Sequence, residues 1–239
     1  MNLSAPYRCR RLLPLTLLLS SLAAHAGLVV NSTRFIYPAD SNSLSVSLSN
    51  TGDSPFLAQT RILADDGRDT AGSVPAQTYV GPPPFTALPP LFQMAGHQDG
   101  QVRLVRTGGN LPSDRESLFY LQLAAIPAGK PGPHSVQMAV RDRFKLFFRP
   151  AGLPGSPGTA YAQLTWHLQS GQLVVHNPTP YYVTLFNLNV EGHLRTNAGM
   201  VPPLSTRTLR GCGSGSCLVR WQSIDDYGKV LSVKQATAQ

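Results

Sequence analysis

The stretch VQMAVRDRFKLFFRPAG, residues 136–152, contains one long apolar alternation and ends soon after a proline. The alternating set is Val136, Met138, Val140, Phe144, Leu146 and Phe148, and only Asp142 interrupts it. The residues between them are mainly polar, and several are cations: Arg141, Arg143, Lys145 and Arg149. Alternation with a period of two is typical of a β-strand that has one apolar and one polar face. The apolar face predicts burial, whereas the row of cations needs a separate explanation.

The β pattern continues on both sides of this stretch. The segments SLSVSLSN (43–50), PFLAQTRIL (55–63), QVRLVR (101–106) and SLFYLQLAAI (117–126) alternate or form short apolar runs between turn residues. No segment keeps a helical period of about 3.6 residues for more than about two turns. Short strands at this spacing, in a chain with 21 prolines and 21 glycines, predict an all-β fold of antiparallel sandwiches.

The segment RPAGLPGSPGTA, residues 149–160, indicates a domain boundary. It holds three prolines and three glycines, which cannot continue a strand and form a short, stiff linker. The β pattern resumes beyond it. We therefore expect an N-terminal sandwich domain over residues 27–150, a linker over 151–158 and a C-terminal sandwich domain over 159–239. We interpret the proline-rich stretch at 80–94 as a loop that leads into a strand.

Residues 1–26 have the features of a secretory signal peptide. Three arginines precede an apolar run over residues 12–22, and the tripeptide AHA at 24–26 places small residues before a cleavage point. A transmembrane anchor is the alternative, but a run of about 11 residues is too short to cross about 30 Å of hydrocarbon. We therefore expect export, without membrane insertion of the mature chain.

Removal of this peptide would change both the charge and the cysteine count. The formal charge of +8, less three arginines, becomes +5, and the remaining cations form no block, so we expect no nucleic-acid partner. Cys9 is removed with the peptide, and Cys212 and Cys217 remain as a pair in CGSGSC. In an exported protein such a pair predicts a disulfide. The alternatives are two free thiols, which an oxidising compartment disfavours, and a metal site, which would need further ligands nearby.

The sequence contains no residue pattern typical of an enzyme. It lacks the motifs G-x-S-x-G and H-E-x-x-H, a P-loop and a dinucleotide fingerprint. The histidines beyond residue 26 lie far apart and mostly beside turns. We therefore expect no catalysis, no cofactor and no metal.

Five stretches, in order and spread over most of residues 27–239, resemble the periplasmic chaperones of the chaperone–usher pathway, the PapD-like family that assembles bacterial pili. They are NSTRFIYPAD (31–40), DRESLFYLQLAAIP (114–127), RFKLFFRPAG (143–152), NPTPYYVTLFNL (177–188) and DDYGKV (225–230). The resemblance implies two immunoglobulin-like sandwiches set in a boomerang, with a cleft between them. It also implies a periplasmic function. Such chaperones bind pilus subunits that lack their last strand, lend them a strand, and pass them to an outer-membrane usher.

On this resemblance, the stretch quoted first contains the lent strand. Val136, Met138 and Val140 would enter the open groove of the subunit, although an alternating strand more often buries its apolar face in its own domain. Main-chain hydrogen bonds would supply affinity, and side-chain pockets would supply specificity. The distal apolar residues are expected to stay in the domain core: Phe144, Leu146 and Phe148.

The resemblance also gives the cations a role. Arg34 and Lys145 match the positions that grip the C-terminal carboxylate of the subunit, and ordinary surface cations are the alternative. This anchor would set the register, since a slip of one residue turns every side chain to the other face. Glu116, Arg149 and Asp226 match an interdomain ion network, in which one guanidinium bridges two carboxylates. As exposed pairs they are expected to fix the angle between domains rather than to stabilise them.

Pro55 matches a proline that covers the subunit-binding strand in free chaperones. Two features depart from the family pattern. The cysteine pair precedes the segment DDYGKV, where we expect it to close a hairpin, and residues 70–90 form a segment longer than the family norm, to which the sequence assigns no role. A structural pilin or adhesin is the alternative function, because it shares the sandwich type. Pilins, however, resemble single incomplete domains with an N-terminal donor extension.

Overall fold

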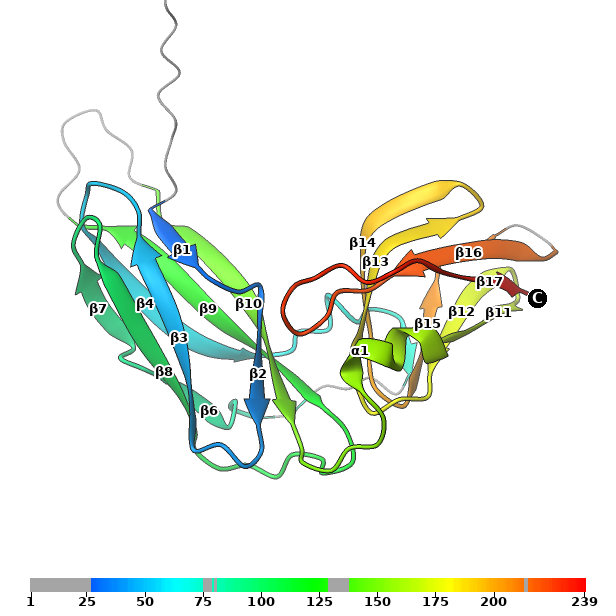
Figure 1. Ribbon diagram of the computed structural model, residues 1–239, viewed down its shortest axis with the longest axis horizontal. Coiled ribbons are helices and arrows are strands. Elements are labelled where there is room, and N and C mark those ends of the chain that lie inside the picture. Colours follow the sequence, from blue (N-terminus) through cyan, green and yellow to red (C-terminus); the bar gives the residue numbers. More distant parts are fainter. Residues whose placement is uncertain (1–26, 75–78, 80, 129–137, 213–214) are drawn as a thin grey trace, which may run out of the picture.

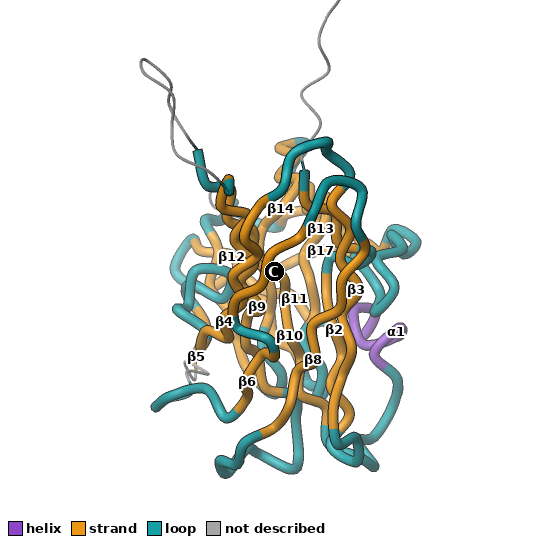
Figure 2. Tube along the Cα trace, turned by 90° about the vertical axis from the view of Figure 1, so that its left-hand side faces the viewer, coloured by secondary structure: helices purple, strands orange, loops and turns teal. Residues whose placement is uncertain are grey.

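A computed structural model describes residues 27–74, 79, 81–128, 138–212 and 215–239. The predicted signal peptide and Val136 lie outside these residues. Almost all of the described chain is strand or loop, and its one α-helix is the short α1 (Pro157–Ala160), which a 3-10 turn (Tyr161–Gln163) follows (Figure 2). The predicted all-β class is confirmed. None of the helical segments in the described part of the chain has the length and hydropathy of a membrane span.

The N-terminal sandwich contains two sheets. The first has the strand order β1 (Leu28–Val30), β3 (Ser43–Asn50), β8 (Asp99–Arg106), β6 (Phe85–Leu88), and the second has the order β2 (Arg34–Pro38), β10 (Val140–Arg149), β9 (Ser117–Pro127), β4 (Phe56–Ala64), β7 (Leu91–Met94). Their inner faces form one core, in which Leu146 and Phe148 are buried as predicted. Phe144 is half-buried at the edge of this core, with its ring 6.1 Å from that of Phe35.

The first two strands of the chain belong to different sheets. β1 pairs antiparallel with β3, whereas β2 pairs parallel with β10. The chain therefore changes sheets at residues 31–33, within the stretch NSTRFIYP. This crossing decides which part of β10 has a neighbour.

The proline-rich stretch at 80–94 contains two strands, β6 and β7, whereas we expected a loop that leads into one strand. β6 and β7 lie in opposite sheets, and the cis peptide Leu88–Pro89 stands between them. Phe85, Ala87 and Met94 are buried. The prolines lie before β6 and between the two strands rather than inside them. They hid two short alternating segments from the sequence pattern.

The C-terminal sandwich also has two sheets. One has the order β11 (Thr165–Gln169), β12 (Gln172–Asn177), β15 (Ser205–Leu209), β5 (Ser73–Val74), and the other has the order β14 (His193–Val201), β13 (Val183–Val190), β16 (Cys217–Gln222), β17 (Lys234–Ala238). Both tryptophans lie in its core, where the rings of Trp166 and Trp221 are 5.2 Å apart. Trp221 Nε1 donates to the carbonyl of Tyr161 at 3.0 Å, so the turn after α1 packs against this core.

A segment from the N-terminal half of the chain joins the C-terminal sheet. Residues 65–74, here called the strap, leave β4 and end in β5, which pairs with β15 (cyan in Figure 1). Thr208 N donates to Gly72 O at 2.8 Å. Gly72 has φ +81, and a Cβ on it would lie 2.6 Å from Thr208 O, so no other residue fits this approach. The strap therefore belongs structurally to both domains, although its residues fall within the range expected for the first.

The two sandwiches meet at an open angle, and the overall shape is that of the predicted boomerang (Figure 1). An apolar cluster joins them: Leu118, Tyr120 and Phe147 from the N-terminal sandwich pack with Met200 and, at its edge, Tyr182. The rings of Phe147 and Tyr182 are 5.5 Å apart. This cluster and the strap hold the domains together beside the linker.

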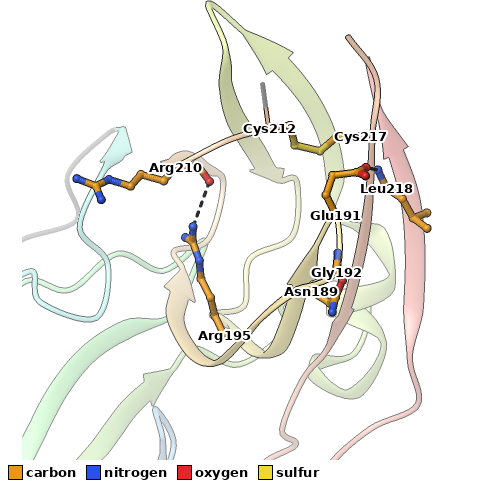
Figure 3. Close-up of a disulfide and its surroundings, with 8 residues drawn as sticks. All are labelled: Asn189, Glu191, Gly192, Arg195, Arg210, Cys212, Cys217 and Leu218. Carbon is orange, nitrogen blue, oxygen red and sulfur yellow. Dashed lines mark hydrogen bonds between the residues drawn. A yellow bond between two sulfur atoms is a disulfide. The ribbon is translucent and has the colours of Figure 1, made fainter. Parts of the chain in front are cut away.

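Cys212 and Cys217 form the predicted disulfide (Figure 3). The expectation that they close a hairpin is wrong. The strands before and after them, β15 and β16, belong to opposite sheets, so the bridged loop crosses from one sheet to the other. Cys217 is buried in the C-terminal core. The backbone of the next residue, Leu218, donates to the Glu191 carboxylate, which ties the loop to the turn after β13.

Candidate functional site

β10 has a complete neighbour on one side and an incomplete one on the other. It pairs with β9 from Val140 to Phe148, but its ladder with β2 begins only at Lys145, opposite Arg34. The missing neighbour follows from the crossing at residues 31–33, which takes the chain to the other sheet. Among the described residues, 140–144 thus form an open strand edge.

Apolar side chains are exposed along this edge. Met138 is 75% exposed and Val140 is 56% exposed. Both line a cavity of about 510 Å³ at the end of the N-terminal sandwich, together with Phe56 and Ala125. The apolar face of the quoted stretch therefore divides into a buried half from Leu146 onward and an exposed half before Phe144.

Pro55 lies on the same cavity, immediately before β4. It is exposed, and its carbonyl accepts a hydrogen bond of 3.2 Å from Ala128 N, which continues the pairing of β4 with β9 by one step. Pro55 thus lines the same cavity as Met138 and Val140.

Arg34 is buried between the two domains. Its side chain leaves β2 toward the C-terminal sandwich, where Nη1 donates to Ile224 O at 2.9 Å and lies 3.5 Å from Thr184 Oγ1. Arg34 is only 8% exposed, and its Nε has no hydrogen-bond partner within the described ranges. Burial lowers the pKa of Arg34, although the charges of Asp226, Asp225 and Glu116 act in the opposite direction. The guanidinium remains a cation, with donor capacity that the protein does not use.

Lys145 stands beside Arg34 in the strand register. Neighbouring residues of parallel strands point to the same face, so both cations face the second domain. The Lys145 side chain is 21% exposed, and its Nζ lies 3.3 Å from the Asp69 carboxylate of the strap. Two residues earlier, Arg143 Nη1 donates to Asp66 Oδ2 at 2.9 Å. Two of the cations of β10, Arg143 and Lys145, thus face the strap.

Glu116, Arg149 and Asp226 form one ion network at the domain junction. Arg149 Nε donates to Glu116 Oε1 at 2.7 Å, and its two terminal nitrogens donate to the Asp226 carboxylate at 2.7 and 2.9 Å. The other oxygen of Glu116 accepts from Tyr182 N at 2.8 Å. Arg149 therefore bridges a carboxylate of each domain.

The expectation that these pairs are exposed is wrong for Glu116, whose side chain is 3% exposed. Burial raises the pKa of Glu116 even though the Arg149 cation and the Tyr182 amide act to lower it. Burial alone would lower the pKa of Arg149, but the hydrogen bonds to Asp226 and the charges of both carboxylates raise it overall. The network therefore carries a desolvation cost that a surface pair does not have.

Two family models match the chain in tandem. The model for the pili and flagellar-assembly chaperone PapD N-terminal domain matches residues 27–154, and that for the pili assembly chaperone PapD C-terminal domain matches residues 159–235. The chain belongs to the PapD-like family of pilus-assembly chaperones. It is therefore a chaperone of the chaperone–usher type, and members of this family are chaperones rather than enzymes.

Individual relatives agree with this assignment. The chaperone is 42% identical over 212 residues to the uncharacterized fimbrial chaperone YcbF of Escherichia coli K12, with 88% of each chain covered. It is 40% identical over 234 residues to the Bordetella pertussis chaperone protein FimB/FhaD, with 92% of this chain and 93% of that one covered.

Solved structures show the same two-domain fold. The E. coli chaperone DraB superposes with a TM-score of 0.75 at 32% identity, covering 89% of this chain and 96% of that one. The Salmonella enterica SafB chaperone, solved with the SafA pilin, also gives a TM-score of 0.75 at 32% identity, with 87% of this chain and 95% of that one covered.

The sequence patterns missed the acidic side of the candidate site. Asp65, Asp66 and Asp69 fall within five positions of a chain with only 12 acidic residues, and this cluster was the available signal. Its partners on β10 lie more than 70 positions away, so no local pattern connects them. Within the described ranges, no group of three or more metal-ligating side chains occurs.

Proposed function

We propose that this protein is a periplasmic chaperone that binds, folds and caps pilus subunits by donor-strand complementation. It then delivers them to an outer-membrane usher. The predicted signal peptide supports export, and the pilus-assembly family supports the class of partner. SafB, whose structure was solved with the SafA pilin, supports direct binding to a subunit.

The open edge of β10 is the observation that carries the proposal. At residues 140–144 the strand has main-chain groups on one side without a neighbouring strand in the described chain, and such an edge pairs readily with another strand. Met138 and Val140 present apolar side chains beside it. Strand addition would satisfy the main-chain groups and bury these side chains in pockets. Each buried side chain of this size would contribute about 1.5–3 kcal/mol before ordering costs.

Arg34 and Lys145 stand at the inner end of the open edge and would set the register of the added strand. A C-terminal carboxylate held there would end its strand beside Lys145, with the preceding residues along the edge toward Val140. The subunit strand would then run parallel to β10, as β2 does. The three N–H donors of Lys145 and the cationic charge of Arg34 beside it suit a carboxylate ligand.

The other site residues receive roles that follow from their positions. Val136 continues the donor alternation beyond Met138. Pro55, on the shared cavity, covers this region in the free protein. The network of Glu116, Arg149 and Asp226 fixes the angle at which the subunit meets both domains.

The proposal is tested by co-expressing the chaperone in the periplasm with a tagged fimbrial subunit from its own gene cluster. Val140→Glu places a charge on the apolar face of the open edge, and we expect it to abolish co-purification. Val233→Glu is the matched control, because Val233 is also a valine, is 59% exposed, and lies in the C-terminal domain. That variant should capture the subunit normally.

Circular dichroism completes the test. Both variants should fold, since both positions are largely exposed and such substitutions change stability by about 0.5 kcal/mol. Capture of the subunit by a folded Val140→Glu variant would refute the donor-strand mechanism. Failure of that variant to fold would show that Val140 packs in the core of its own domain.

A further inference from the structure

The strap places carboxylates against the cations of β10. Asp69 Oδ2 lies 3.3 Å from Lys145 Nζ and also accepts a hydrogen bond of 2.8 Å from the hydroxyl of Tyr120. One step along the strand, Asp66 accepts from Arg143 at 2.9 Å. A small pocket of about 270 Å³ lies between these groups. The residue proposed to hold a subunit carboxylate is thus already paired with a carboxylate of its own chain.

The backbone of the strap is held firmly at Asp69. Met200 N donates to Asp69 O at 2.6 Å. Gly199, with φ +83, lets the two chains approach, because a Cβ there would collide with Asp69 O. Arg207 is 6% exposed, and its Nε donates to Ala71 O at 2.8 Å. The C-terminal domain therefore positions Asp69, and its backbone cannot withdraw from Lys145 without breaking these bonds.

The hydroxyl of Tyr120 is a fixed hydrogen-bond donor to Asp69. Tyr120 is buried, and burial together with the negative charge of Asp69 raises the pKa of its hydroxyl. The hydroxyl thus keeps its proton and donates a hydrogen bond to Asp69. The side chain of Asp69 is 29% exposed and lines the small pocket together with Lys145. A ligand carboxylate that reaches Lys145 would meet the negative charge of Asp69 at close range.

We propose that Asp69 is a built-in competitor for the carboxylate anchor and a residue that sets the affinity for the subunit. The inference rests on the proposed function. In the free chaperone, Asp69 neutralises Lys145, so a carboxylate alone gains little by binding. A subunit that also adds a strand to the open edge gains enough to share or displace this pair. Asp69 therefore selects ligands that offer both a strand for the open edge and a carboxylate for Lys145. It also keeps the complex weak enough for the subunit to be passed on.

Asp69→Asn is the direct test. Asparagine keeps an oxygen that accepts from Tyr120, and the backbone bond to Met200 is unaffected. The matched control is Asp66→Asn, in the same strap but paired with Arg143. Asp69→Asn removes a negative charge that lies a few ångströms from the ligand carboxylate, beside a partly exposed pocket. This change should tighten carboxylate binding by on the order of ten-fold. Asp69→Glu keeps the charge and should bind as weakly as the wild type.

The first probe is N-acetylglycine, titrated by NMR, with N-acetylglycinamide as the uncharged comparison. We expect Asp69→Asn alone to gain affinity for the acid, no variant to gain affinity for the amide, and the gain to vanish in Lys145→Ala. Unchanged or weaker binding of the acid by Asp69→Asn would overturn the inference and make Asp69 a residue that positions Lys145.

The second probe is the co-expressed subunit. Tighter retention of the subunit by Asp69→Asn than by wild type supports the inference. If the wild type captures the subunit and Asp69→Asn shows no gain with either probe, the competitor role fails and the proposed function stands. If the acid binds more tightly but no protein captures the subunit, the proposed function fails and Asp69 still acts on a carboxylate site.

Discussion

Replacing Arg149 with methionine isolates the energetics of the domain junction. Methionine keeps much of the side-chain length but removes the hydrogen bonds that Arg149 donates to Glu116 and Asp226. The two carboxylates are affected differently, because the Glu116 side chain is 3% exposed whereas that of Asp226 is 28% exposed. Asp226 can rehydrate, and its loss of a partner costs at most about 1 kcal/mol. Glu116 remains buried without its cation.

The expected loss of stability comes mainly from Glu116. Breaking a buried ion pair by removing one partner costs about 3–5 kcal/mol. Glu116 keeps its hydrogen bond from Tyr182 N at 2.8 Å, which favours the lower end of this range. We therefore expect Arg149→Met to lower the free energy of unfolding by about 3 kcal/mol at pH 7. Most of this loss should fall on the N-terminal domain, which contains Glu116.

The pH dependence has a definite sign. Burial already raises the folded-state pKa of Glu116 above its ordinary value of 4.5, so the folded state binds this proton more tightly than the unfolded state. Stability from this group is fully present below 4.5 and falls as the pH rises toward the folded pKa. Removing the cation raises that pKa further. The difference in unfolding free energy between wild type and Arg149→Met should therefore increase above pH 4.5. Below pH 4.5 it should decrease to about 1 kcal/mol, which corresponds to the lost hydrogen bonding.

Urea titration with two probes separates the domains. The chain has two tryptophans, Trp166 and Trp221, and both lie in the C-terminal core. Tryptophan fluorescence therefore reports the C-terminal domain, whereas far-ultraviolet circular dichroism reports both sandwiches. Arg149→Met should move the dichroism transition to lower urea more than the fluorescence transition.

Glu116→Gln in the same background is the control. Glutamine is neutral and still accepts from Tyr182 N, so the double variant should recover most of the stability that Arg149→Met loses. A double variant as unstable as the single one would refute the argument that the stranded charge causes the loss. The argument would also be refuted if Arg149→Met lowered the free energy of unfolding by less than about 1 kcal/mol at pH 7, with no pH dependence.

The remaining predictions concern the bridge and the anchor. Mass spectrometry of exported protein without reductant should show Cys212 and Cys217 bonded, and replacing both with serine should cost about 2 kcal/mol in the fluorescence transition; free thiols would contradict this. Lys145→Ala should weaken the subunit complex by about 2–4 kcal/mol with little change in chaperone melting, because its pair with Asp69 is partly exposed. Arg34→Ala should also release the subunit, and it should lower the melting temperature of the chaperone because the hydrogen bond to Ile224 is lost. If either variant forms an unchanged complex with the subunit, the cation it lacks is not part of the anchor.

The parts of the fold that depend on local alternation were predictable. β10 and the buried positions of Leu146 and Phe148 follow from a period of two, because a strand in a sandwich must place alternate residues in the core. The network of Glu116, Arg149 and Asp226 came from the family resemblance and not from the pattern. Its burial could not be predicted, because the Tyr182 backbone covers Glu116 from the other domain.

Features that depend on which strands pair were not predictable. The strap is polar and short, and the residues that hold it, Met200 and Arg207, lie about 130 positions further along the chain. The hairpin expected at the disulfide failed for the same reason. The strands on either side of Cys212 and Cys217 alternate equally well whether they pair with each other or with strands of opposite sheets, and only the whole sandwich decides between the two.

One feature of the chain produces both halves of the proposed site. The crossing at residues 31–33 withdraws a neighbour from residues 140–144 and, at the same point, brings Arg34 beside Lys145. The open edge and the cationic anchor are therefore adjacent by construction, which suits a ligand that offers a strand and a terminal carboxylate together. An open edge also invites pairing with other copies of the chain, and charges along an edge oppose such pairing. Arg141 and Asp142 are exposed on this edge between the apolar positions. Asp142, which interrupts the apolar alternation, thus fits an edge that accepts the strand of a subunit but disfavours pairing with other copies of the chain.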